Sequence, residues 1–228
     1  MTVDSDGPEA YLGQDAVVDF GRPEIGDLAG DLRSHHTDDV DFARAAFEHV
    51  RDNIRHSWDV QDTRVSISAS DTLAHGTGLC FAKAHLLAAI LRSQGIPTGF
   101  CYQRLTDDGA TFMLHGLVAV FLNGNWHRQD PRGNKPGVDA QFSLGEERLA
   151  WPVRPELGER DYHRVSTPPP ARESSKPSKP RTTFSTSAAA DSPAISDSTL
   201  LCWWRGRRTH AVAVSFRSST PHRGGVRR

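Results

Sequence analysis

Hydrophobic residues recur at helical spacing in one long stretch near the middle of the chain. From Cys80 to Gln94 the apolar side chains fall three and four positions apart, which predicts an amphipathic helix of about four turns. Gly95 follows as a stop signal, and Pro97 prevents the helix from resuming. The glycine-bearing segment 76–78 leads directly into this helix. The pattern therefore predicts a loop that runs into the central packed helix of a small domain.

Two further helices are predicted before the central one. An apolar stripe preceded by the capping residues 37–39 predicts a helix over 39–54, with its charged side chains on a solvated face. Ser68 followed by Asp71 resembles a capping box, so a short helix or a turn is expected over 70–75. Both segments end before the glycine-bearing loop, which places them next to the central helix in the chain.

The flanking segments carry weaker patterns. Residues 1–36 are polar with short apolar touches, so an extended arm or strand with a turn around Gly26 is expected. The stretch 143–151 begins with a helix-start pattern and is expected to be helical until the prolines that follow. On the central helix, Lys83 and His85 are expected to lie on a partly exposed face.

An Asn-Gly dipeptide at 123–124 separates two β-rich runs, 114–122 and 125–130. Asn-Gly between such runs is the strongest short hairpin signal in a sequence. A two-residue turn fixes the register, so that the numbers of paired residues sum to 247. His115 and Asp130 then become diagonal neighbours on one face, about 7–8 Å apart or less at Cβ. Their side chains can close that gap.

The composition changes abruptly after residue 165. Residues 1–165 contain 25 acidic and 16 basic residues, whereas residues 166–228 contain 3 acidic and 11 basic ones. The second segment also holds 12 Ser, 7 Thr and 7 Pro in 63 positions, which is typical of disorder. We therefore expect one domain over 1–165 and a Ser/Pro-rich basic tail over 166–228. A change of reading frame near 165–170 is a second explanation, and resequencing the locus would test it.

The cysteines and the lack of metal-site, signal-peptide and membrane-span patterns bear on the cofactors, the cellular location and the binding partners that we expect. The three cysteines form neither a disulfide framework nor a Cys-x-x-Cys pair, and no acidic cluster resembles a calcium loop, so we expect no metal and no cofactor. The acidic N-terminus lacks the apolar core of a signal peptide, and no run approaches the ~20 apolar residues of a membrane span. A soluble cytoplasmic protein without membrane contact is predicted. The scattered basic residues of the tail do not favour nucleic-acid binding, and the oligomeric state is not predicted.

Three residues could form a nucleophile, a base and an orienting acid. Cys80 lies in the first helical turn, where unpaired N–H groups and the helix dipole favour a thiolate. His115 would move the proton, and Asp130 would hold the imidazole. The Cys80 backbone N–H could donate to an oxyanion, with Gln61 or Trp58 as candidates for the second donor. Each residue alone also has an ordinary structural explanation, but their joint geometry favours a catalytic set.

These segments resemble the transglutaminase-like superfamily. Gly-Thr-Gly-Leu-Cys at 76–80 with the helix that follows, the His strand from His115 to Trp126, and Gln-Asp-Pro-Arg-Gly-Asn at 129–134 are similar to its three motifs, in order. The resemblance covers about residues 10–165 and is strongest to short prokaryotic members described as cysteine proteases. It implies a papain-like α+β fold in which the nucleophile helix packs on an antiparallel sheet. It also implies acyl transfer through a thioester by Cys80, His115 and Asp130.

Two classes of function follow. The first is a cysteine-dependent amidase, protease or transamidase that acts on peptide or protein carboxamides. The alternative is a non-catalytic module that binds peptides or proteins on the same fold. A complete nucleophile, base and orienter favours the enzyme, because a binding module needs none of the three.

Overall fold

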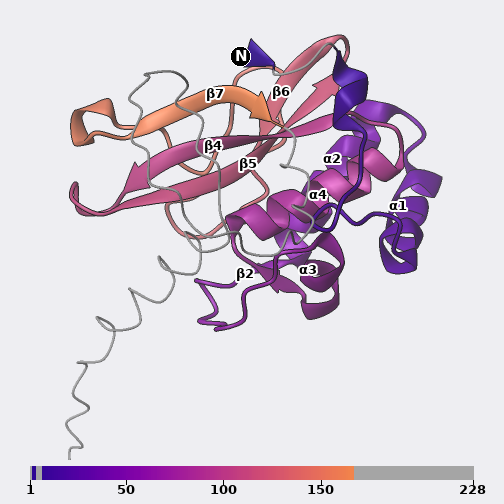
Figure 1. Cartoon of the computed structure of the whole chain (residues 1–228), viewed down its shortest axis with the longest axis horizontal. Helices are drawn as coiled ribbons and strands as arrows, with labels where there is room; N and C mark the ends of the chain where they lie inside the picture. Colours follow the sequence, from indigo (N-terminus) through magenta and orange to yellow (C-terminus); the bar gives the residue numbers. More distant parts are fainter. Residues whose placement is uncertain (1, 4–6, 167–228) are drawn as a thin grey trace, which may run out of the picture. The chain divides into compact units, whose positions relative to one another are not determined.

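In the computed structural model, which describes residues 2–3 and 7–166, helices pack against one face of a sheet (Figure 1). The helices are α1 (Pro23–His35), α2 (Asp39–Asn53), α3 (Ala69–His75) and α4 (Cys80–Ser93), with 3-10 turns η1 (Pro8–Tyr11) and η2 (Pro155–Leu157). The strands are β1 (Thr2–Val3), β2 (Arg55–His56), β3 (Thr77–Gly78), β4 (Thr98–Thr106), β5 (Phe112–Leu122), β6 (Asn125–Gln129) and β7 (Arg160–Ser166). The predicted α+β class is confirmed.

The main sheet has five strands in the order β1-β7-β4-β5-β6. The pairs β7–β4, β4–β5 and β5–β6 are antiparallel, and only the short β1–β7 pair within this sheet is parallel. A separate two-stranded parallel ladder joins β2 to β3, just before α4. This small ladder brings the chain that leaves α2 alongside the residues that precede Cys80.

Helix α4 is the centre of the core, as its periodicity predicts. Its side chains Leu86, Leu87 and Ile90 are fully buried between the sheet and the other helices. Each buried side chain of this size contributes roughly 1.5–3 kcal/mol to the free energy of unfolding. The helix ends at Ser93, and Gly95 has the left-handed φ of 77° that a helix stop favours.

The two helices predicted before α4 are also confirmed. The side chain of Asp38 caps α2 by accepting hydrogen bonds from two backbone N–H groups of its first turn. Ser68 caps α3, because its Oγ accepts from the Asp71 N–H at 3.1 Å. The apolar stripe of α2 is buried against the core, as expected.

The expectation for residues 1–36 is wrong in one respect. Helix α1 runs straight through Gly26, where a turn was expected. Pro23 starts the helix at a favourable position, and Ile25 and Ala29 are fully buried. Packing of this face on the core outweighs the ~1 kcal/mol that a glycine costs inside a helix.

The segment 143–151 is not helical, which also contradicts the expectation. Its backbone bonds to Gln129 and Asp130 and lacks the regular bonds of a helix. Gln129 and Ser143 exchange two such bonds, between Gln129 Nε2 and Ser143 O at 2.7 Å and between Ser143 N and Gln129 Oε1 at 3.2 Å. The Ala150 N–H is used by Asp130. The segment is therefore a strap that crosses the end of β6, and we call residues 141–151 the strap.

The hairpin between β5 and β6 has the predicted register. Pairing runs from Leu122 with Asn125 to Val118 with Gln129, so paired numbers sum to 247. The turn residues Asn123 and Gly124 have φ values of 51° and 75°, which a type I′ turn requires.

Lys83 lies in the interior rather than on a partly exposed face. Its side chain is fully buried, and Nζ donates to the carbonyl oxygens of Arg51, at 3.1 Å, and Ile54. These carbonyls lie at the C-terminal end of α2, where a helix leaves acceptors unpaired. His85 is half-buried, with Nδ1 2.8 Å from the Ile67 carbonyl oxygen.

Strand β7 extends the structured domain to Ser166, and no sequence pattern predicted it. Apart from Ser166, the predicted basic tail over 166–228 lies outside the described residues. Within the part of the chain that the structure describes, no helix is long and apolar enough to cross a membrane.

Candidate active site

Cys80 is the first residue of α4, and its thiol is only partly exposed. The residue before it, Leu79, is extended and provides no side-chain cap, so the N-terminal N–H groups of α4 stay available. The Gly116 N–H donates to the Cys80 sulfur at 3.5 Å. A helix N-terminus and a backbone donor both favour the thiolate over the thiol.

Gly116 lets β5 approach the start of α4. A Cβ at this position would lie 3.2 Å from both the Cα and the Cβ of Phe81. Such contacts are tighter than ordinary van der Waals packing, and a backbone atom cannot rotate away. The absence of a side chain at Gly116 therefore helps to set the distance between Cys80 and the strand that carries His115.

We expect Gly116→Ala to separate α4 from β5 and to weaken the Cys80 thiolate. Overpacking of this kind costs about 1–3 kcal/mol of unfolding free energy, and the donor to the sulfur moves away. Urea denaturation and the pH dependence of thiol alkylation measure the two effects. Gly30→Ala in α1 is the matched control, because its new Cβ meets no atom within 4 Å. A Gly116→Ala protein with unchanged alkylation would show that this close approach is unimportant.

His115 and Asp130 form a buried pair beside the nucleophile candidate. His115 Nε2 lies 2.8 Å from Asp130 Oδ2, and the two residues are 3% and 0% exposed. Asp130 also accepts from the Ala150 N–H at 3.0 Å and from the Arg132 N–H at 3.2 Å. Burial alone would raise the pKa of Asp130, but the charge of His115 and these hydrogen bonds lower it.

The electrostatics of the site favour the proton on His115 over Cys80. Burial opposes the charged form of both groups, but Asp130 and Cys80 together raise the pKa of His115 to about 10. Likewise, burial raises the pKa of the Cys80 thiol, while His115 and His56 lower it to about 5. Because Asp130 holds Nε2, Nδ1 is the ring nitrogen left to face Cys80. Both shifts favour a thiolate–imidazolium pair at neutral pH.

His56 also contacts Cys80, and sequence reasoning missed it. Its imidazole lies close enough to the thiol to lower the pKa of Cys80, and burial lowers the pKa of the imidazole itself, which favours its neutral form. The pairing of His56 with Gly78 in the β2–β3 ladder brings it there. No pattern could have revealed this contact, because the ladder has only two residue pairs and joins segments that read as loops.

The two predicted candidates for the second oxyanion donor lie on the turn that follows His56. Trp58 is 45% exposed, and Gln61 is exposed with a left-handed φ of 55°. The backbone N–H of Gln61 is bonded to the Trp58 carbonyl at 3.4 Å. Their role as donors stays a prediction. Within the described residues, no three His, Cys, Asp or Glu side chains are arranged to hold a metal ion.

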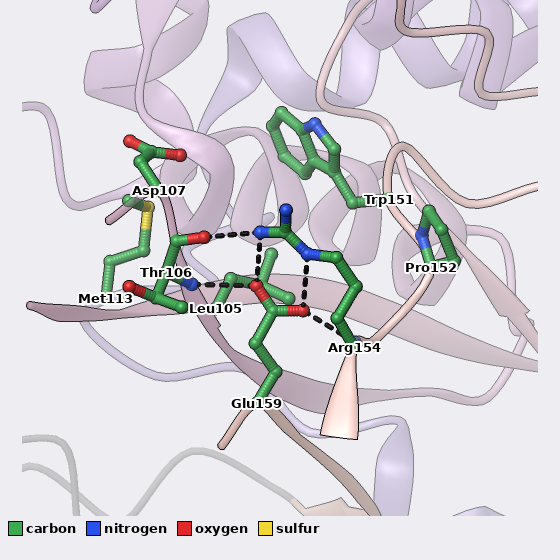
Figure 2. Close-up of a pocket in the computed structure, with 8 residues that line it drawn as sticks. All are labelled: Leu105, Thr106, Asp107, Met113, Trp151, Pro152, Arg154 and Glu159. Atoms are coloured by element: carbon green, nitrogen blue, oxygen red, sulfur yellow. Dashed lines mark hydrogen bonds and ion pairs between the residues drawn. The ribbon is translucent and has the colours of Figure 1, made fainter. Parts of the chain in front are cut away.

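Trp151, at the end of the strap, forms one wall of the site. Its ring meets His115 edge-on, with the ring centroids 5.1 Å apart, and the Arg132 guanidinium carbon lies 5.1 Å from its centroid. Trp151 also borders a cavity of about 340 Å³, shown in Figure 2. There, Arg154 and Glu159 bond to each other and to Thr106, and Leu105, Met113 and Pro152 also line the cavity. A cavity with a mixed apolar and charged lining thus adjoins the His115 side of the site.

Residues 26–131, which include Cys80, His115 and Asp130, match the family profile described as the transglutaminase-like superfamily. The predicted resemblance to this superfamily is confirmed. The match ends one residue after Asp130, so the strap and β7 lie outside it. The backbone N–H groups of Arg132 and Ala150 that hydrogen-bond Asp130 therefore come from a part of the chain that the family profile does not cover.

Solved structures with a similar arrangement include a candidate cysteine protease from Cytophaga hutchinsonii, at 19% identity and a TM-score of 0.43, covering 57% of this chain and 43% of that one. The periplasmic domain of TgpA from Pseudomonas aeruginosa is also similar, at 19% identity and a TM-score of 0.39, covering 54% of this chain and 46% of that one. The chain thus spans less than half the length of these proteins. No curated protein sequence matches it.

Proposed function

We propose that this transglutaminase-like domain is a cysteine-dependent enzyme that transfers the acyl group of a peptide or protein carboxamide through a thioester. The observation that carries the proposal is the buried His115–Asp130 pair placed beside Cys80 at the start of α4. Burying an imidazolium and a carboxylate together costs desolvation free energy. A third group that interacts with the imidazolium gives this arrangement a function. Here that group is a thiol with a strongly lowered pKa.

The chemical steps follow from these positions. The Cys80 thiolate forms a bond to the carboxamide carbon, and the carbonyl electron pair moves onto oxygen. The Cys80 backbone N–H, at the helix start, donates to this oxyanion. Collapse breaks the C–N bond, and the amine leaves with the proton of His115. Water or a second amine then attacks the thioester, gives its proton to His115 and releases the Cys80 thiolate.

Asp130 has a positioning role in this scheme. It fixes His115 in one orientation by accepting from Nε2, so that Nδ1 faces the sulfur and the leaving group. The N–H groups of Arg132 and Ala150 hold Asp130 in turn. The alternative, a non-catalytic binding module, does not account for the lowered pKa of the Cys80 thiol.

The pH dependence of Cys80 alkylation tests the proposal. In the full chain, the iodoacetamide rate at Cys80 is expected to rise with an apparent pKa of about 5. Cys101 is the internal control, because burial raises the pKa of its thiol to about 12. Peptide mass spectrometry separates the two thiols. His115→Ala is expected to move the Cys80 rise towards the ordinary thiol pKa of about 8.5, and His56→Gln to move it less.

Each outcome has a clear reading. A low apparent pKa that depends on His115 supports the thiolate–imidazolium pair and justifies assays with amide substrates. Labelling of Cys80 no faster than of Cys101 in a folded sample would contradict the proposal and favour the binding module. Peptide or protein substrates and a cytoplasmic location stay predictions.

A further inference from the structure

A second cavity lies on the His56 side of the site. It measures about 270 Å³ and is formed where the C-terminal end of α2, strand β2, helix α4 and the loop after Asp130 meet. We call it the basic cavity. Its charged lining groups are Arg51, Asp52, Arg55, Asp59, Lys83 and Arg132. His56 also lines it and lowers the pKa of the Cys80 thiol, so the basic cavity adjoins the nucleophile candidate.

The lining carries an excess of positive charge. Four cationic side chains face two carboxylates, and both carboxylates are already engaged. Asp52 is paired with Arg51, at 2.7 Å. Asp59 is shared between Arg132 Nη1, at 2.5 Å, and Lys135, at 3.0 Å. The two remaining cations, Arg55 and Lys83, have no carboxylate of their own among the described residues.

Two of these cations have unused donors. Arg132 is 2% exposed, yet its Nε has no hydrogen-bond partner within the described part of the chain. Unpaired buried donors are rare, because each costs about 1–3 kcal/mol. Arg55 is exposed, and its guanidinium makes no ion pair with a described residue. His56 Nδ1 is likewise buried without a partner among the described groups.

The third cation shows the electrostatic cost of this arrangement. Burial, together with the nearby charge of Arg132, lowers the pKa of Lys83 to about 7. Its contacts with the carbonyls of Arg51 and Ile54 stabilise α2 but supply no negative charge. Capping of α2 by Lys83 does not require a second cation, Arg132, next to Lys83. An anion in the basic cavity would offset this repulsion.

We propose that the basic cavity binds a carboxylate of the acyl-donor substrate, an acidic side chain or a free terminal carboxylate close to the reacting carboxamide. This inference rests on the proposed function for its substrate, but the cavity itself does not depend on turnover. The planar carboxylate suits guanidinium donors, and Arg132 Nε and Arg55 provide them. The cavity thus selects acidic peptides over neutral ones.

Alkylation by a matched pair of reagents tests this inference without a substrate. Iodoacetate and iodoacetamide both alkylate Cys80, and they differ by a carboxylate in place of a carboxamide. Their rate ratio at Cys80 cancels the intrinsic reactivity of the sulfur, and the attraction of the His115 imidazolium for the iodoacetate carboxylate is common to the wild type and the Arg55 variants. We expect Arg55→Gln to lower this ratio about threefold or more, and Arg55→Glu to lower it further. In 1 M salt, where the Debye length is about 3 Å, the ratio of the wild type is expected to fall towards that of Arg55→Gln.

Arg22→Gln is the matched control, because Arg22 is an exposed arginine outside the basic cavity. Equal ratios in the wild type, Arg55→Gln and Arg22→Gln would overturn the inference. The test also separates this inference from the proposed function. If the ratio depends on Arg55 but the protein turns over no amide, the carboxylate site is supported and the proposed enzymatic function is contradicted. If the protein turns over amides but the ratio does not depend on Arg55, the proposed function is supported and the carboxylate site is contradicted.

Discussion

Replacing Cys80 by serine is expected to lower acyl-transfer turnover by about 10⁴-fold or more, the loss typical of removing a nucleophile. The lowered pKa is specific to the thiol, and a serine hydroxyl stays protonated beside the same His115. The distance between the Gly116 nitrogen and the side-chain atom of residue 80 also suits a sulfur better than an oxygen. The Gly116 N–H lies 3.5 Å from Sγ, and a serine oxygen on a shorter bond lies too far away for the ~2.9 Å that an N–H···O bond prefers.

Ammonia release from glutamine-containing peptides and incorporation of a fluorescent primary amine measure the two possible fates of the thioester. Mass spectrometry of the intact chain detects the acyl-enzyme directly. Cys101→Ala is the matched control, since this thiol is fully buried in β4, away from the proposed chemistry. Turnover in Cys80→Ser at the level of Cys101→Ala would exclude Cys80 as the nucleophile.

Asp130→Asn is expected to reduce turnover by about 10²–10⁴-fold while keeping the shape of the side chain. The amide cannot hold a buried imidazolium, so the pKa of His115 falls and the pKa of the Cys80 thiol rises. Asp130→Ala also leaves the N–H groups of Arg132 and Ala150 without their acceptor. Removing one partner of a buried ion pair costs about 3–5 kcal/mol of unfolding free energy.

The stability difference between the wild type and Asp130→Asn has a defined pH dependence. The pKa of folded His115, about 10, lies above its unfolded value of about 6.5. The contribution of the protonated imidazole is therefore complete below pH ~6.5 and is lost as the pH rises towards 10. Urea denaturation at pH 6 and pH 10 measures this loss, with the exposed Asp139→Asn as control. An equal stability difference at both pH values would show that Asp130 does not hold a charged His115.

Much of the site geometry follows from local sequence signals. The periodicity and the Gly95 stop place Cys80 at the start of α4, and the Asn-Gly turn fixes the register that brings His115 next to Asp130. Both signals depend on interactions between residues close in the chain. Such interactions act in nearly every context, so the prediction and the structure agree.

Other parts depend on contacts between distant residues, and the sequence does not reveal them. The strap is not helical because its backbone finds acceptors and donors on β6 and Asp130, although residues 143–146 resemble a helix start. Lys83 is buried because its Nζ donates to backbone carbonyls at the end of α2. No local sequence pattern shows that the end of α2 lies next to Lys83. The contact of His56 with Cys80 arises in the same way, through a ladder of two pairs.

The strap also has a consequence for the order in which the site is assembled during synthesis. Cys80 and His115 leave the ribosome well before Ala150 and Trp151, the residues that hold Asp130 and border His115. Until the chain has grown past Trp151, Asp130 lacks its second backbone donor and the imidazole lacks its apolar wall. We therefore expect the proposed thiolate–imidazolium pair to form only after the strap has been synthesised.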